Sequence, residues 1–283
     1  MKIIKILNNN LVFARDDAGQ EVIVKGLGIG FHASRGEAVD ESRIGQIFYP
    51  QPRQNLQQMM DFLMSIPEEY LNFVQEFVDG IKARENIQFN SSIYLSLSDH
   101  LLGTLKRYRE GMSLQNMLLL EIKRLYKKEY SWGQQMLLEV KDTFGVALPE
   151  DEAGFIALHF VNAEEGGSDT DSYRIAAIVR DVQQTVKDYY KDLVFDENSL
   201  YYERFLTHLK FFAQRYLHHE LQSSQDDGLY ELVSKQYREA FGCVKMIYLM
   251  MEDHYGYQLS KEEMMYLTIH IQTNAEHARR AAT

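Results

Sequence analysis

Four of the nine histidines in this chain of 283 residues occupy equivalent places in an internal repeat. A shift of 111 residues lays 144–159 over 255–270, with the same Gly, Leu, Glu and terminal His. Upstream, the stretch that ends at His100 resembles the stretch that ends at His208. Each copy therefore carries two histidines, 59 residues apart in the first and 62 in the second, and the full set is His100, His159, His208 and His270.

Paired histidines without other catalytic groups favour a phosphoryl acceptor over an enzyme. Neutral imidazole is a nucleophile at physiological pH and accepts a phosphoryl group by covalent transfer. The phosphoryl group adds about 1.5–2 negative charges, enough to repack an interface between acidic helices. A histidine buried in the core is the simpler interpretation for any one of them, but a duplicated pair argues against it.

The sequence lacks the motifs of metal sites, cofactor-binding sites and catalytic triads. The sequence contains no HExxH, no His-x₃-His and no cysteine cluster, so we expect no metal site. It contains no P-loop and no GxSxG, so we expect neither a cofactor nor a catalytic triad. Glu152 and Glu263 each precede a histidine by seven residues, about 10 Å along a helix and too far for contact. We expect both to act as helix caps.

Residues 1–48 have the pattern of short strands. KIIKIL, LVFAR, EVIVKG and QIFYP are β-branched or aromatic and are separated by turn-forming residues. They predict a small antiparallel sheet. About 55 residues is a marginal size for an independent core, so we expect a homodimer that buries the second face of the sheet.

From Gln54 onward the apolar periodicity is helical. Capping boxes are predicted at Ser65–Glu68 and Ser260–Glu263, and Pro149 is expected to open a further helix. The fold class is α+β multidomain: a small antiparallel sheet followed by two all-α bundles. The predicted domains are 1–55, 56–168 and 169–283.

The charge distribution and the composition limit the kinds of partner and of cellular compartment that we expect for this chain. The chain carries a net charge of −11, whereas residues 1–55 hold seven basic and six acidic residues, which leaves −12 for the rest. A polyanion partner must therefore bind the first segment. The single Cys243 fits a reducing compartment, and neither a signal peptide nor a membrane-spanning run is evident. We expect a cytoplasmic protein without membrane insertion.

Several long motifs resemble the BglG/SacY/LicT family of transcriptional antiterminators. They cover nearly the whole chain in the order of that family, and lie at 2–10, 25–31, 91–100, 148–159, 205–214 and 266–270. The resemblance implies a dimeric co-antiterminator RNA-binding domain followed by two phosphotransferase-system regulation domains. The implied partner is a hairpin in the leader mRNA of a sugar-utilisation operon, with motifs of the β-glucoside type.

The resemblance also implies how the chain is controlled. Phosphorylation by a sugar-specific enzyme II would inhibit through the first helical domain, and phosphorylation by the carrier HPr would activate through the second. The implied acceptors are His100 and His159, then His208 and His270.

The same resemblance assigns an RNA-binding face, made of Lys5, Asn8, Asn10, Lys25, Gly26 and Phe31. Asn can read base edges, Phe can stack, Lys can meet phosphate and Gly allows close backbone approach. From the sequence alone, Asn8–Asn10 could equally be a turn and Phe31 a core residue. Leu27 stands where many relatives carry Arg, so a guanidinium contact is either missing or supplied elsewhere, for example by Arg35.

Two other functions remain open. A phosphotransfer enzyme would pass the phosphoryl group quickly to a third protein. A DNA-binding activator with the same helical domains would need a helix-turn-helix at its start, where this chain has a strand pattern. We therefore expect no DNA partner.

Overall fold

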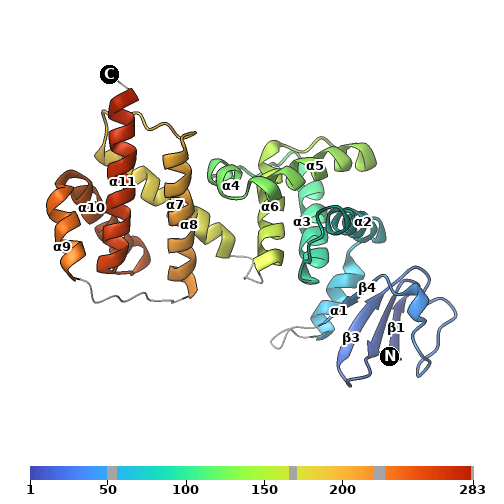
Figure 1. Cartoon of the computed structure of the whole chain (residues 1–283). Coiled ribbons are helices and arrows are strands. Elements are labelled where there is room, and N and C mark those ends of the chain that lie inside the picture. The colour runs from blue at the N-terminus through green and yellow to red at the C-terminus, as the bar shows by residue number, and fades with distance from the viewer. Residues whose placement is uncertain (50–55, 166–170, 219–226, 282–283) are drawn as a thin grey trace. The chain divides into compact units, whose positions relative to one another are not determined.

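The computed structural model describes residues 1–49, 56–165, 171–218 and 227–281 (Figure 1). These residues form two compact units. The first comprises Met1–Gln115 and Ser131–Gly166, and the second comprises Asn116–Tyr130 and Gly167–Thr283. The domain boundaries expected near 55 and 168 adjoin or lie within 50–55 and 166–170, outside the described residues. The division into three domains stays a prediction.

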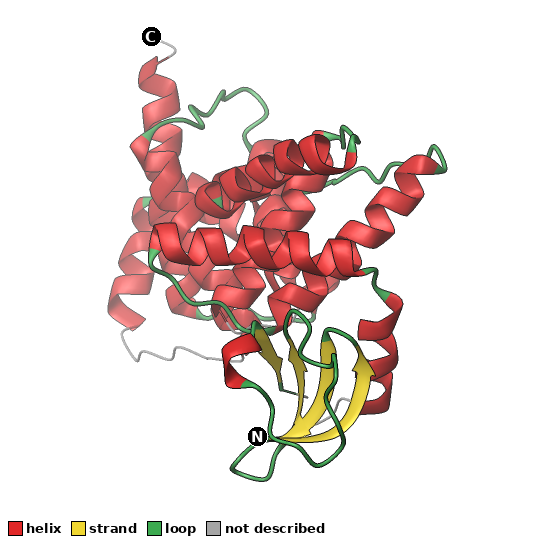
Figure 2. Cartoon of the chain, turned by 90° about the vertical axis from the view of Figure 1, so that its right-hand side faces the viewer, coloured by secondary structure: helices red, strands yellow, loops and turns green. Residues whose placement is uncertain are grey.

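The first unit begins with a four-stranded sheet in the order β1-β2-β3-β4, with every neighbouring pair antiparallel. The strands are β1 (Lys2–Asn8), β2 (Leu11–Arg15), β3 (Glu21–Lys25) and β4 (Gln46–Phe48). A short 3₁₀ helix, Glu41–Arg43, precedes β4. All strands lie at the start of the chain, and every regular element described after residue 56 is a helix (Figure 2). The predicted fold class is confirmed.

Both faces of this sheet are buried within one chain. Val12 and Val24 point to one face and pack with Ile29 and Val39 from the long β3–β4 connection. The alternate side chains, Leu11, Phe13, Ile23 and Phe48, join a core with α1 (Leu56–Ser65) and α2 (Glu68–Glu85). The helices thus cover the face that we expected a second copy to bury. The homodimer stays a prediction.

The remaining helices of the first unit are α3 (Ser92–Arg109), most of α5 (Lys127–Phe144) and α6 (Glu150–Glu165). α2 ends where Asn86 takes a left-handed conformation with φ of 52°. α6 begins directly after Pro149, as predicted, with three acidic residues in its first turn that complement the helix dipole.

One of the two predicted capping boxes is wrong. Ser65 is the last residue of α1, and its hydroxyl donates to the carbonyl of Phe62 (2.7 Å), so it is turned back into its own helix. α2 then starts at Glu68 after Pro67, without a side-chain cap.

The second capping box is confirmed. Glu263 N donates to Ser260 Oγ (3.1 Å) and Ser260 N donates to Glu263 Oε2 (2.9 Å).

The second unit is built from α4 (Leu119–Leu125), α7 (Asp171–Tyr189), α8 (Leu200–His218), α9 (Asp227–Gln236), α10 (Arg238–Tyr255) and α11 (Lys261–Ala281). α4 packs against α7 and α8. Arg124 pairs with Glu197, and Lys127 Nζ lies 2.7 Å from Glu203 Oε1. The segment 116–130 therefore packs with the later helices, although the repeat assigned it to the first bundle.

No helix within the described ranges has the length and apolar character needed to cross a membrane.

Gly133 controls the approach of α5 to α6. A Cβ at this position would lie 2.2 Å from the carbonyl oxygen of Ala153 in α6. We expect Gly133→Ala to destabilise the first unit by about 1–3 kcal/mol, because the two backbones must separate. The measurement is urea unfolding followed by fluorescence of Trp132, the single tryptophan, which is buried in this unit.

The matched control is Gly80→Ala in α2, where a Cβ would meet no described atom within 4 Å. Its effect should be a gain of about 0.5–1 kcal/mol from the lost flexibility of the unfolded chain. Equal stability of the two variants would contradict the tight crossing.

Candidate functional site

The first histidine pair lies where α3 packs against α6. The ring centroids of His100 and His159 are 5.1 Å apart with an interplanar angle of 54°. Both side chains are half-buried, with His100 Nε2 and His159 Nδ1 buried. Two residues that are 59 positions apart in the sequence thus form one site.

The second pair repeats this arrangement on α8 and α11. The rings of His208 and His270 are stacked, with centroids 4.8 Å apart and an interplanar angle of 27°. Both are half-buried. The structure therefore brings together, within each unit, the two histidines that the repeat paired.

Burial keeps three of these four imidazoles, those of His159, His208 and His270, neutral at pH 7. It lowers the pKa of His159 from 6.5 to about 3, with a smaller contribution from the neighbouring His100. Burial also lowers the pKa of His208 to about 4, and it lowers the pKa of His270. At pH 7 these three rings carry a free nitrogen lone pair, which is the form that attacks phosphorus.

Glu152 faces the first pair, contrary to its expected role as a cap. Its side chain is 2% exposed, and Oε2 lies 3.0 Å from His100 Nε2, at ion-pair distance although the N–H is not aligned for a hydrogen bond. Thr104 Oγ1 donates to the same oxygen (3.2 Å), and Arg107 donates to Thr104 (2.9 Å). The expectation was wrong because spacing along α6 considers only His159, whereas the contact crosses to α3.

Glu263, the equivalent residue in the second repeat, does cap its helix. One carboxylate oxygen accepts from Ser260 N, and Tyr257 OH donates to both oxygens (3.0 and 3.1 Å). The first repeat has Pro149 and Val146 at the positions of Ser260 and Tyr257, and neither side chain can form a hydrogen bond. Without these two hydrogen-bond partners, the carboxylate of Glu152 contacts His100 and Thr104 on α3 instead.

Arginines flank the second pair. Arg204 lies one turn before His208 on α8 and Arg215 lies two turns after it. Burial is the main cause of the lowered pKa values of this pair. Arg204 lowers the pKa of His270 further, and both His270 and Arg215 lower the pKa of His208 further. Within the described residues, Arg215 Nε is buried without an acceptor.

The candidate RNA-binding face is a loop packed on a turn. The loop 26–31 lies over Asn8–Asn10, with Gly26 N donating to Asn10 O and Gly30 N donating to Asn9 O, both at 2.9 Å. A Cβ on Gly26 would lie 1.8 Å from the carbonyl oxygen of Arg43, so only glycine fits this close approach. Asn8 also forms the turn that its sequence suggested, since its Oδ1 accepts from Asn10 N (2.9 Å).

Exposed side chains on this loop leave a surface for a base. Phe31 is 56% exposed and contacts the ring of His32 at 4.0 Å, so the core interpretation of Phe31 does not hold. Lys5 is exposed as well. The guanidinium nearest the loop belongs to Arg43, whose Nη1 donates to Gly28 O (2.8 Å). The sequence analysis did not predict the contact between Arg43 and Gly28, because Arg43 lies 15 residues after the glycine and outside the loop.

Two of the expected RNA contacts are turned toward α2. Lys25 is only 6% exposed, and its Nζ donates to Asn72 Oδ1 (2.8 Å) and Gln75 Oε1 (2.6 Å). Burial lowers the pKa of this ammonium group. Asn10 Oδ1 accepts from Gly28 N, and its Nδ2 donates to Glu68 at the start of α2.

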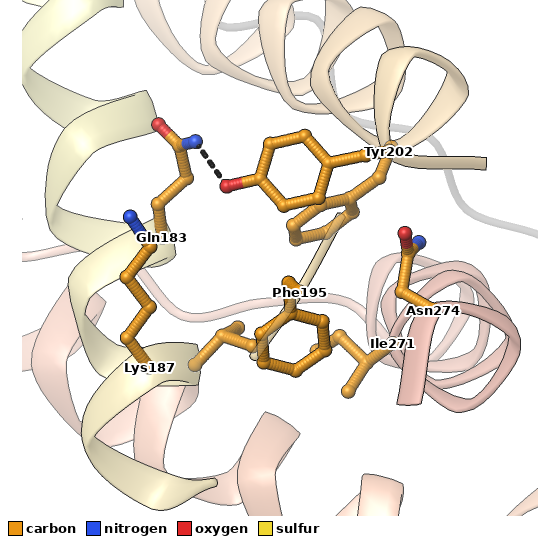
Figure 3. Close-up of a pocket in the computed structure, with 8 residues that line it drawn as sticks. Gln183, Lys187, Phe195, Tyr202, Ile271 and Asn274 are labelled. Atoms are coloured by element: carbon orange, nitrogen blue, oxygen red, sulfur yellow. Dashed lines mark hydrogen bonds between the residues drawn. The ribbon is translucent and has the colours of Figure 1, made fainter. Parts of the chain in front are cut away.

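Within the described ranges, no three His, Cys, Asp or Glu side chains form a group that could bind a metal ion. A cavity in the second unit has a volume of about 10 Å³, roughly one water molecule. Figure 3 shows its mostly apolar lining, with Tyr202 accepting a hydrogen bond from Gln183 and with Asn274 nearby. Asn274 also donates to the backbone carbonyl of His270, one turn earlier on α11 (2.8 Å).

Comparison with known proteins identifies each part of the chain. Residues 1–57 match the CAT RNA binding domain, and residues 75–163 and 182–274 each match the PRD domain. The two PRD matches contain one histidine pair each.

Relatives of the same length are similar throughout. The transcription antiterminator LicT of Bacillus subtilis is 40% identical over 272 residues, covering 96% of this chain and 98% of the relative. The beta-glucoside operon antiterminator of Dickeya chrysanthemi is 39% identical over 272 residues, covering 96% of each. The crystal structure of GlcT CAT-PRDI is similar with a TM-score of 0.50 and 30% identity, over 58% of this chain and 97% of that one.

The lowered pKa of His159 makes the first unit acid-sensitive. Its folded pKa of about 3 lies below the unfolded value near 6.5, so its contribution is complete above pH 6.5 and declines as pH falls toward 3. Between pH 6.5 and 5 the free energy of unfolding should fall by roughly 1–2 kcal/mol more in the wild type than in His159→Gln. Urea unfolding at several pH values, followed by Trp132 fluorescence, measures this difference. His254→Gln, at an exposed position, serves as control, and identical pH slopes for all three proteins would contradict the burial of His159.

Proposed function

Because this chain belongs to the BglG/SacY/LicT family of transcriptional antiterminators, we propose that it binds a hairpin in a leader mRNA. Binding prevents the overlapping terminator from forming, so that a sugar-utilisation operon of the β-glucoside type is transcribed. The chain acts as a regulator in the cytoplasm, where the leader is made. The match of residues 1–57 to an RNA-binding domain and the whole-length similarity to two antiterminators support this function.

The RNA-binding surface is formed by the loop 26–31 and the turn 8–10. Exposed Phe31 supplies a stacking plane for an unpaired base, and Asn8 supplies donors and acceptors for a base edge. Lys5 meets backbone phosphate. Lys25 and Asn10 join this surface when their contacts with α2 are released.

The four paired histidines accept phosphoryl groups from the sugar phosphotransferase system. A ring nitrogen lone pair attacks phosphorus, the bond from phosphorus to the donor breaks, and the donor keeps that electron pair. A sugar-specific enzyme II modifies His100 and His159, and HPr modifies His208 and His270. The geometry that supports this assignment is the spacing of the half-buried rings, whose centroids are 5.1 Å apart in the first pair and 4.8 Å apart in the second.

The two helical domains respond with opposite sign. Phosphorylation of the first pair disfavours the RNA-binding homodimer, and phosphorylation of the second pair favours it. A tenfold shift of such an equilibrium requires about 1.4 kcal/mol, within reach of two added charges.

The direct test is a gel shift of the full chain against the leader RNA of the neighbouring sugar operon. We expect a shifted complex that weakens as salt is added, because Lys contacts to phosphate release counterions. Binding to an unrelated hairpin with equal affinity would contradict a specific antiterminator.

Phe31 tests the RNA surface. Phe31→Ala should lower RNA affinity about tenfold, since stacking on one base contributes about 1–3 kcal/mol. Leu138→Ala, at a position of α5 that is 65% exposed and lies outside this loop and turn, is the control and should leave affinity within about twofold. The circular dichroism of both variants should equal that of the wild type, and an unfolded Phe31→Ala would instead assign the ring to the core.

The sign of regulation is tested with a reporter placed behind the terminator. His100→Ala should give expression without the inducing sugar, because the inhibiting phosphoryl group has no acceptor. His208→Ala should reduce expression even with inducer. The same phenotype from substitutions in both pairs would mean that the histidines are structural.

A further inference from the structure

The two histidine pairs face groups of opposite charge. Beside the first pair lies the carboxylate of Glu152, 3.0 Å from His100 and 2% exposed. Near the second pair, α8 carries Arg204 one turn before His208 and Arg215 two turns after it, while the equivalent carboxylate of Glu263 is engaged in its helix cap. The repeats share their histidines but not this surrounding charge.

The difference follows from a few substitutions between the copies. Alignment of His100 with His208 places Thr104 over Phe212, so the hydroxyl that donates to Glu152 has no counterpart in the second copy. Ser96 aligns with Arg204, so the first copy lacks that cation. Arg107 and Arg215 do align, but Arg107 is bound to Thr104 in the chain of hydrogen bonds that ends at Glu152.

We propose that Glu152 is the residue that makes the first helical domain open when His100 is phosphorylated, whereas Arg204 and Arg215 hold a phosphoryl group on the second pair. This inference rests on the proposed function, because it takes the histidines as acceptors. Glu152 is a positioning residue: it orients His100 in the unmodified domain and reacts to the charge that the ring acquires.

Electrostatics determine the direction of each response. Like charges a few ångströms apart repel strongly where water cannot screen them, and the carboxylate of Glu152 is buried. Thr104 donates to Glu152 and Arg107 donates to Thr104, so the one cation of this hydrogen-bond chain already faces the charge of Glu152, and the chain has no second cation for a phosphoryl dianion. α3 and α6 must therefore separate. On the second pair, a phosphoryl group on His270 of α11 would instead accept hydrogen bonds from the arginines of α8, including the buried N–H of Arg215, and this draws α8 and α11 together.

Potassium phosphoramidate supplies the phosphoryl group without any partner protein. Its P–N bond breaks as a ring nitrogen of His attacks phosphorus, and the released ammonia takes up the proton that the imidazole loses. Mass spectrometry of the full chain locates the acid-labile phosphate, and hydrogen exchange reports the opening of each helix.

In the wild type, phosphorylation should speed exchange in α3 and α6 at least tenfold and should slow it in α8 and α11. In Glu152→Gln the acceleration should fall below twofold, because the amide retains the size of the side chain and its bond from Thr104 but has no charge. Glu152→Asp should restore the acceleration. Glu150→Gln removes the same charge from an exposed position on the same helix and should behave as the wild type.

A separate variant tests the second pair. Arg204→Gln, at an exposed position, should abolish at least half of the slowing in α8 and α11. This arm remains informative if Glu152→Gln does not fold, and full protection in Arg204→Gln would overturn the role given to the arginines.

The outcomes separate the inference from the proposed function. If Glu152→Gln carries as much phosphate as the wild type and opens as far, the inference is wrong while the histidines remain acceptors. If none of the four histidines is modified, the proposed phosphorylation fails and the inference fails with it.

Discussion

Close helix packing is the constraint on which the candidate sites depend. Each imidazole pair exists only because two helices approach until rings from distant parts of the chain lie about 5 Å apart. In the first unit Gly133 lets α5 approach the backbone of α6, and α6 packs against α3. The same packing removes water, and dehydration keeps the rings of His159, His208 and His270 neutral. Geometry and nucleophilic form thus have one common cause.

Much of this organisation is visible in the sequence. Short runs of β-branched and aromatic residues between turn-forming residues locate all four strands, because such side chains favour extended backbone. The repeat pairs His100 with His159 and His208 with His270, since duplicated sequences adopt the same helix packing. The predictions from the sequence agree with the structure where a residue period or the internal repeat carries the information.

The sequence alone does not predict contacts between elements that are distant along the chain. Glu152 looks like a cap when only its own helix is considered, and its contact with α3 needs the crossing of two helices. Lys25 has the charge of an exposed RNA ligand, yet α2 provides two side-chain oxygens that hold it in a buried place. The segment 116–130 packs with the second unit, against its order in the chain. None of these has a periodic signal.

Pro149 and Ser260 occupy equivalent positions of the internal repeat, and this has a consequence for how the two helical domains diverged. The two residues stand at the same place in copies of one ancestral module, and proline and serine codons can differ by one base. A change of one base at this position is therefore one of the few substitutions that distinguish a glutamate that caps its helix from one that contacts an imidazole. Gene duplication followed by so few changes can separate two modules that read the same kind of signal, without new binding surfaces or new chemistry.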